Sequence, residues 1–114
     1  MSAVYVSNLI INTGATFSQS FDLLNAEGSG PLDLTDFTAT AQFRKHAGSS
    51  SKTDFTVEFE DPRTDGKIKI SLTSTQTAAI SKPGRYVYDV LIDSGSVKTR
   101  VIEGSVLVRE GVTK

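Results

Sequence analysis

The 114-residue sequence contains no cysteine and a single histidine, His46. Without cysteine, the chain can form neither a disulfide nor a thiolate metal site, which suits assembly in a reducing cytoplasm. No apolar run approaches the roughly 18 residues of a membrane span, and residues 1–11 lack the basic stretch and apolar core of a signal peptide. A net charge of −1 gives no field to attract nucleic acid or an anionic membrane. We therefore expect one soluble domain over residues 1–114.

Apolar and polar residues alternate along most of the chain, and this period of two is typical of half-buried strands. The alternating runs are 4–11, 16–23, 37–44, 55–60, 67–72, 86–92 and 97–109. One apolar and one polar face per strand predicts an all-β antiparallel sandwich of about seven strands. The side chains expected to point inward are Phe17, Phe21, Phe37, Phe43, Phe55, Phe59, Ile70, Tyr88, Val90 and Val106.

Turn-forming residues separate these runs at intervals of about ten residues, which favours a sandwich over βαβ units. The breaks are 25–31, 48–52, 61–66 and 93–96. In the third of them, Gly66 is expected to adopt a positive φ. The segment Ser74–Ser81 differs, because it starts with a good helix N-cap and is stopped by Lys82-Pro83-Gly84. It predicts one or two helical turns that cross from one sheet to the other.

Residues for nucleophilic catalysis are few. His46 follows Arg44 and Lys45, and three serines come shortly after it at 49–51. A Ser–His–acid site needs a histidine base that a carboxylate orients, together with an oxyanion hole. The neighbours of His46 in sequence are cations, which cannot orient its imidazole in this way. We therefore interpret this segment as a solvated strand end and loop and expect no catalytic residues.

Carboxylates occur in pairs at three places: Asp33 with Asp36, Glu58 with Glu60, and Asp61 with Asp65. Such pairs can serve glycosidases or bind calcium. The loop 61–66 lacks the ligand spacing of a calcium loop, and 33–36 is typical of a turn whose side chains cap nearby backbone groups. We expect turn and cap roles, with no metal and no cofactor.

Three further features have weak functional signals. The loop Gly28-Ser29-Gly30 is not followed by the helix and Lys-Ser/Thr pair of a phosphate cradle. Arg44, Lys45 and Lys52 form a small basic end without interleaved exposed aromatics, so nucleic-acid binding is not expected. Tyr86 and Tyr88 share one strand face and can stack on sugars, but we expect that face to point to the core with both hydroxyls bonded at its rim.

Four stretches in a fixed order carry a family resemblance. They are Asp33-Leu34-Thr35-x-Phe37, then 68–73 running into 75–80, then Pro83-Gly84-Arg85-Tyr86-Val87-Tyr88-Asp89-Val90, and then 99–108 with Gly111-Val112-Thr113 at the end. In these stretches the chain resembles a group of short bacteriophage proteins that have an immunoglobulin-like β-sandwich and are similar to the N-terminal domain of upper baseplate proteins. The resemblance spans roughly residues 14–113.

The resemblance implies a non-enzymatic part of a virion, in a tail, baseplate, neck or capsid-decoration position. We expect other virion proteins and copies of the chain itself as partners, and no small-molecule substrate. The protein would be made in the bacterial host cytoplasm and located in the virion. A carbohydrate- or receptor-binding sandwich is the alternative, and it requires exposed aromatics or a calcium loop. A small hydrolase is a third class, which requires a clustered acid, base and nucleophile.

Residues 4–11 lie outside the resemblance and are apolar on both parities. Val4, Val6 and Ile10 fall on one face of this strand, and Tyr5, Leu9 and Ile11 fall on the other. Such a strand is either covered on both faces or pairs with another chain. The last strand, 97–109, is long enough to extend past the sandwich, with 110–114 as a loose end. We expect these terminal segments and the strand edges to contact neighbouring subunits.

Overall fold

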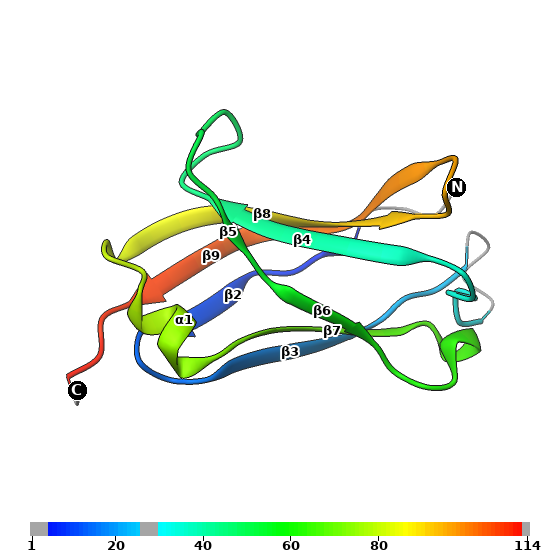
Figure 1. The fold of residues 1–114 in the computed structure, drawn as a ribbon, viewed down its shortest axis with the longest axis horizontal. Coiled ribbons are helices and arrows are strands. Elements are labelled where there is room, and N and C mark those ends of the chain that lie inside the picture. The colour runs from blue at the N-terminus through cyan, green and yellow to red at the C-terminus, as the bar shows by residue number, and fades with distance from the viewer. Residues whose placement is uncertain (1–4, 26–29, 113–114) are drawn as a thin grey trace.

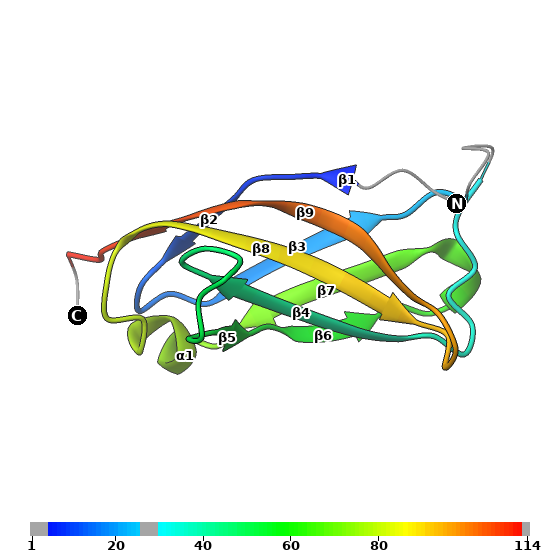
Figure 2. The ribbon, with the colours of Figure 1, turned by 90° about the horizontal axis from the view of Figure 1, so that it is seen from above.

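The computed structural model describes residues 5–25 and 30–112. Nine strands, one α-helix and one 3₁₀ turn follow one another in this part of the chain; Figure 1 labels β2 to β9 and α1, and Figure 2 labels β1. Their bounds are β1 Tyr5–Val6, β2 Leu9–Asn12, β3 Phe17–Asp22, β4 Thr38–Arg44, β5 Thr53–Asp54, β6 Thr56–Phe59, η1 Arg63–Asp65, β7 Lys67–Leu72, α1 Ser74–Ala78, β8 Gly84–Asp93 and β9 Lys98–Arg109.

Two sheets lie face to face in Figures 1 and 2. The six-stranded sheet has the order β1-β9-β8-β4-β5, with β2 also paired to β9, and the three-stranded sheet has the order β3-β7-β6. β1 and β2 are two parts of one strand, because both pair with β9 in the same register. β5 and β6 are likewise joined through Phe55, where the chain leaves one sheet for the other. Counted in this way the described chain has seven strands, and the predicted all-β sandwich is confirmed.

The strand directions differ from the prediction at one place. β1 and β2 pair with β9 in parallel, with Tyr5 opposite Ile102 and Leu9 opposite Val106, whereas the other strand pairs are antiparallel. A fully antiparallel sandwich is therefore wrong for the first strand.

The start of β8 holds the corner between the two sheets. The Tyr86 hydroxyl donates a hydrogen bond of 2.6 Å to the carbonyl oxygen of Lys82, four residues earlier. A tyrosine that bonds back to the backbone upstream of this strand is the corner found in immunoglobulin-like sandwiches. The contact agrees with the immunoglobulin-like class that the family resemblance implies.

The core lies between the sheets and contains eight of the ten side chains expected there. Phe17, Phe21, Phe43, Phe55, Ile70, Tyr88, Val90 and Val106 are buried. Phe37 and Phe59 are half-buried and pack against the core from its margin. The Arg63 guanidinium lies 4.3 Å from the centre of the Phe59 ring and donates a hydrogen bond of 2.8 Å to the Phe37 carbonyl oxygen. Both rings therefore lie at the end of the sandwich, where the η1 turn shields them in part.

The predicted helical turn is confirmed, but its cap lies one residue earlier. Thr73, not Ser74, is the N-cap: its side chain accepts from the Gln76 amide, and the Gln76 side chain accepts from the Thr73 amide. This reciprocal arrangement is a capping box. α1 connects β7 in one sheet with β8 in the other, and its buried Thr77 hydroxyl donates to the Ala15 carbonyl oxygen at 2.9 Å.

Gly66 confirms the turn predicted before β7. Its φ is +68°, and a Cβ at this position would lie 2.5 Å from the Leu23 carbonyl oxygen. Both the backbone conformation and the lack of space therefore require glycine.

The last strand does not extend past the sandwich. β9 pairs with β8 over the length of both strands, from Gly84 opposite Val108 to Asp93 opposite Lys98. The predicted overhang of the last strand is therefore wrong. β8 pairs with β9 as far as Val108, β2 pairs with its last residue, Arg109, and the hairpin turn at 94–97 joins β8 and β9 directly. Beyond β9, the Gly111 amide donates to the Thr13 hydroxyl at 3.0 Å, and residues 113–114 lie outside the described part.

Candidate functional site

The segment around His46 forms a loop between β4 and β5. The Ser49 amide donates to the His46 carbonyl oxygen at 3.0 Å, which is a turn contact between backbone atoms. The His46 side chain is exposed, and the described structure places no carboxylate in hydrogen-bonding contact with it. The geometry is that of a solvated loop.

The paired carboxylates take part in turns and in ion pairs across strands. The Asp33 Oδ1 accepts hydrogen bonds from the Thr35 amide at 3.0 Å and hydroxyl at 2.6 Å, and these bonds lower the pKa of Asp33. Glu58 lies opposite Lys69, with 4.0 Å between Oε1 and Nζ. In the described residues, no three His, Asp or Glu side chains come close enough together to hold a metal ion.

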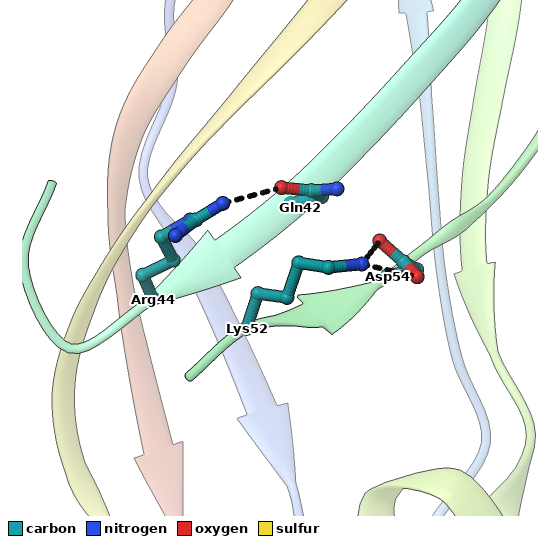
Figure 3. A network of polar contacts seen from close by, with 4 residues as sticks. All are labelled: Gln42, Arg44, Lys52 and Asp54. Atoms are coloured by element: carbon teal, nitrogen blue, oxygen red, sulfur yellow. Dashed lines mark hydrogen bonds and ion pairs between the residues drawn. The ribbon is translucent and has the colours of Figure 1, made fainter. Parts of the chain in front are cut away.

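The cations at the basic end each contact a neighbouring side chain, and Figure 3 shows these contacts for Arg44 and Lys52. Arg44 donates to the Gln42 side-chain oxygen at 3.2 Å, and Lys52 donates to both carboxylate oxygens of Asp54 at 3.1 and 3.0 Å. The Lys52 ammonium also lowers the pKa of Asp54. Lys45 lies over the Tyr86 ring, 4.9 Å from its centre. These contacts divide the positive charge among local partners instead of gathering it in one patch.

The two tyrosines of β8 lie as the sequence predicts. Tyr88 is buried, and its hydroxyl donates to the Ser7 carbonyl oxygen at 2.6 Å. Burial raises the pKa of Tyr88 to about 12. Tyr86 is half-buried, and its hydroxyl bonds at the rim. Of the glycine-rich loop, Gly28 and Ser29 lie outside the described residues.

The most unusual surface is the strand formed by β1, β2 and the two residues between them, Tyr5–Asn12, which we name the N-terminal edge. Leu9 and Ile11 of this edge are buried, whereas Tyr5, Val6 and Ile10 are 53%, 67% and 54% exposed. The predicted strand with two apolar faces is therefore covered on one face, and Val6 and Ile10 point away from the core. No described strand pairs with the side of this edge opposite to β9.

Close contacts fix the N-terminal edge on β9. The Ser7 amide donates to the Glu103 carbonyl oxygen at 3.0 Å. The Asn8 side-chain oxygen accepts hydrogen bonds from the Ser105 amide at 3.1 Å and hydroxyl at 3.0 Å. At Gly104 a Cβ would lie 2.0 Å from the Ser7 carbonyl oxygen, so the two backbones meet where no larger residue fits. The edge is thus a fixed part of the sheet.

Beside this edge, the outer face of the six-stranded sheet has an open depression of about 500 Å³. Its lining includes Val6, Arg44, His46, Val87, Asp89 and Arg100. Arg100 is paired with Asp89 at 3.2 Å and with Glu103 at 3.7 Å. No local sequence pattern predicts this depression, because it is formed by side chains of four separate strands and a loop that only the strand order brings together.

No family model matches the chain, and no curated protein matches it. Among solved structures, that of InlP from Listeria monocytogenes is similar, with a TM-score of 0.50 and 14% sequence identity. The match covers 95% of this chain and 28% of InlP, so the chain spans less than a third of that protein's length. At this identity the likeness shows the fold alone. No described helix is long and apolar enough to span a membrane.

Proposed function

We propose that this protein is a non-enzymatic structural component of a bacteriophage particle, in a tail, baseplate, neck or capsid-decoration position. It acts through contacts with other virion proteins and with copies of itself. The family resemblance over residues 14–113 supports the assignment to a phage particle. The N-terminal edge is the surface through which we propose that the protein contacts its neighbours. The exposed apolar side chains of that edge are the observation on which the proposal depends.

The side of the N-terminal edge opposite to β9 presents both backbone groups and apolar side chains. The Ser7 and Thr13 amides donate to carbonyl oxygens of β9, at 3.0 and 2.9 Å. Backbone groups alternate in direction along a strand, so those of Val6 and Ile10 face away from β9. The same two residues expose large apolar side chains. Main-chain hydrogen bonds and apolar side chains are together what a strand offers to an added strand.

The two outer faces of the sandwich differ in a way that supports this role. The three-stranded sheet presents polar side chains joined by ion pairs, such as Lys67 with Asp22 at 3.0 Å. The six-stranded sheet exposes Val6, Ile10 and Val87. A subunit that meets its neighbours through one face needs this asymmetry, because exposed apolar area on both faces would favour unspecific association.

A carbohydrate- or receptor-binding module is the second candidate, and the depression beside Val6 is the observation that favours it. Its charged side chains offer hydrogen-bonding groups to a polar ligand. Sugar sites commonly add an aromatic ring for stacking, and the aromatic ring that lines the depression, Tyr88, is buried. The depression therefore gives weaker support than the edge.

The direct test is protein mass spectrometry of phage particles purified by two successive density gradients from a culture that expresses the gene. We expect the chain at a fixed ratio to the major capsid protein, retained after a high-salt wash. A phage-encoded cytoplasmic enzyme from the same culture serves as the control for carry-over. Loss of the chain in parallel with that enzyme would contradict the proposal.

A further inference from the structure

We infer that the N-terminal edge pairs antiparallel with the N-terminal edge of a second copy, about a two-fold axis at Asn8. This inference names a partner for the edge and rests on the proposed structural role for its biological use. The association itself is a property of the isolated chain. Figure 2 shows β1 along the border of the six-stranded sheet beside β9, which is the side where a further strand would continue that sheet.

The N-terminal edge lacks the features that protect the other free strand edges from pairing. Natural sheets keep free edges from pairing by making them short or by placing charge or proline on them. β5 has two residues, β6 contains Glu58, and β3 ends in Asp22. The sequence Tyr5–Asn12 is eight residues long without charge, proline or glycine. Of the described edges, this one alone is both long and uncharged.

The exposed apolar side chains of the N-terminal edge lie symmetrically about Asn8, two residues before it and two residues after it. In an antiparallel pair centred on Asn8, Val6 lies opposite Ile10 of the second copy, and Ile10 lies opposite Val6 of the second copy. Both residues belong to the set whose backbone groups face outward, so each opposite pair exchanges two main-chain hydrogen bonds. The contact is self-complementary, as a two-fold interface must be, and no like charges meet in it.

The length of the edge sets the strength of the contact. Eight residues span about 26 Å, and a contact one strand deep over that length buries less than the roughly 800 Å² per partner of a stable dimer. We therefore expect association at a chain concentration of about 0.1–1 mM, too weak to persist in dilute solution. Several such contacts within one particle add, since neighbouring subunits raise the local concentration.

Two double variants test the register through charge. Val6→Lys with Ile10→Lys places like charges opposite each other across the axis and is expected to weaken dimerisation by about tenfold or more. Val6→Lys with Ile10→Glu places Lys opposite Glu twice in the same register, and is expected to dimerise more strongly at low salt than at high salt. Sedimentation equilibrium up to about 1 mM measures both. Val97→Lys, at an exposed position in the β8–β9 turn, is the matched control.

Wild-type protein that stays monomeric over this concentration range would overturn the inference, as would equal association of the two double variants. A second measurement does not depend on charge. The chain has no cysteine, so Val6→Cys with Ile10→Cys introduces two thiols, each opposite the other in the second copy, and leaves the Asn8 contact with Ser105 intact. Opposite residues in a hydrogen-bonded pair lie about 5.5 Å apart at Cα, within disulfide range.

Air oxidation of the variant with Val6→Cys and Ile10→Cys should give covalent dimers about ten times faster than oxidation of a variant with Leu24→Cys and Val97→Cys, two exposed apolar positions away from the edge. Equal rates would reject the axis at Asn8. Far-UV circular dichroism of each variant shows that the sandwich is kept. Presence of the chain in purified particles together with a monomeric wild type would leave the proposed function standing and remove this inference. Self-association of a chain absent from particles would do the reverse.

Discussion

At the scale of single residues, Tyr88 links the sandwich core to the N-terminal edge. Its ring is 4% exposed and lies within 6.2 Å of the Phe55 ring, centre to centre. Its hydroxyl donates to the Ser7 carbonyl oxygen. A buried tyrosine hydroxyl needs such a partner, because an unbonded one would lose its hydrogen bonds to water without replacement. The Tyr88 side chain thus connects β8, from within the core, to the backbone between β1 and β2.

This contact predicts a dependence of stability on pH. Burial raises the pKa of Tyr88 to about 12, whereas a tyrosine in an unfolded chain titrates near 10. Between these values the unfolded state loses the proton and the folded state keeps it. The free energy of unfolding should therefore be unaffected by this group below pH 10 and fall as pH rises from about 10 to 12.

Urea unfolding at pH 8, 10 and 11 measures this effect against Tyr88→Phe, which has no hydroxyl to titrate. We expect the variant to be about 1 kcal/mol less stable at pH 8, since it lacks the bond to Ser7. The difference between the two proteins should shrink as pH rises, because the wild type loses stability that the variant never had. A difference that stays constant from pH 8 to 11 would contradict the assignment.

Phe21 tests the assignment of the core face. It is 4% exposed and meets the Tyr5 ring edge-on, with 6.2 Å between ring centres. Phe21→Ala should lower the free energy of unfolding by about 3–5 kcal/mol through lost burial and the cavity that remains. Ser20→Ala on the opposite face should change it by less than about 0.5 kcal/mol. Similar values for both variants in urea titrations would show that the face is misassigned.

At the scale of elements, Gly104 decides whether β1 and β2 can lie against β9. A Cβ there would meet the Ser7 carbonyl oxygen at 2.0 Å. Gly104→Ala should therefore push the two strands apart, lower stability by about 1–3 kcal/mol and speed amide hydrogen exchange across 5–12. Gly48→Ala is the control, because its Cβ would have an ordinary contact of 3.7 Å with the His46 ring. Equal stability and exchange in the two variants would contradict this packing.

The strands and the helix also show which features of the fold a local sequence pattern can predict. Period-two alternation is a local signal, so it predicts the strands, the inward phenylalanines and the tyrosine face correctly. Burial at strand ends is not local: Phe37 and Phe59 continue the alternation of their strands, but both are half-buried at the margin of the core, and the Arg63 guanidinium lies over the Phe59 ring. The N-cap at Thr73 was missed because Ser74 is an equally good cap by residue type.

The N-terminal edge is likewise predictable only in part, because its burial depends on residues far away in the sequence. The two parities of residues 4–11 show that the strand is apolar on both sides. Which side is buried depends on β9, whose residues lie about a hundred positions away in sequence and which pairs with the strand in parallel. The depression beside Val6 requires β4, β8 and β9 in their final order. No local pattern contains that order.

At the scale of the whole molecule, one strand both stabilises the sandwich and offers a surface to a neighbouring subunit, through side chains on its two opposite faces. Leu9 and Ile11 of the N-terminal edge are part of the core, whereas Val6 and Ile10 face outward. Deleting residues 1–11 would therefore remove core side chains and confuse a folding defect with an assembly defect. Point changes on the exposed parity avoid this, because replacing exposed side chains usually changes stability by less than about 0.5 kcal/mol.

This separation gives the prediction for assembly. A protein with Val6→Lys and Ile10→Lys should fold with the wild-type urea midpoint, yet enter particles far less than the wild type when both are expressed during phage growth. Lysines on a free edge discourage strand addition, whichever chain supplies the strand. The Val97→Lys variant should enter particles normally, because it changes an exposed apolar residue away from the edge. Quantitative mass spectrometry of purified particles, with isotope-labelled wild type as internal standard, gives the ratio. Equal incorporation of both variants would show that particles hold the domain through another surface.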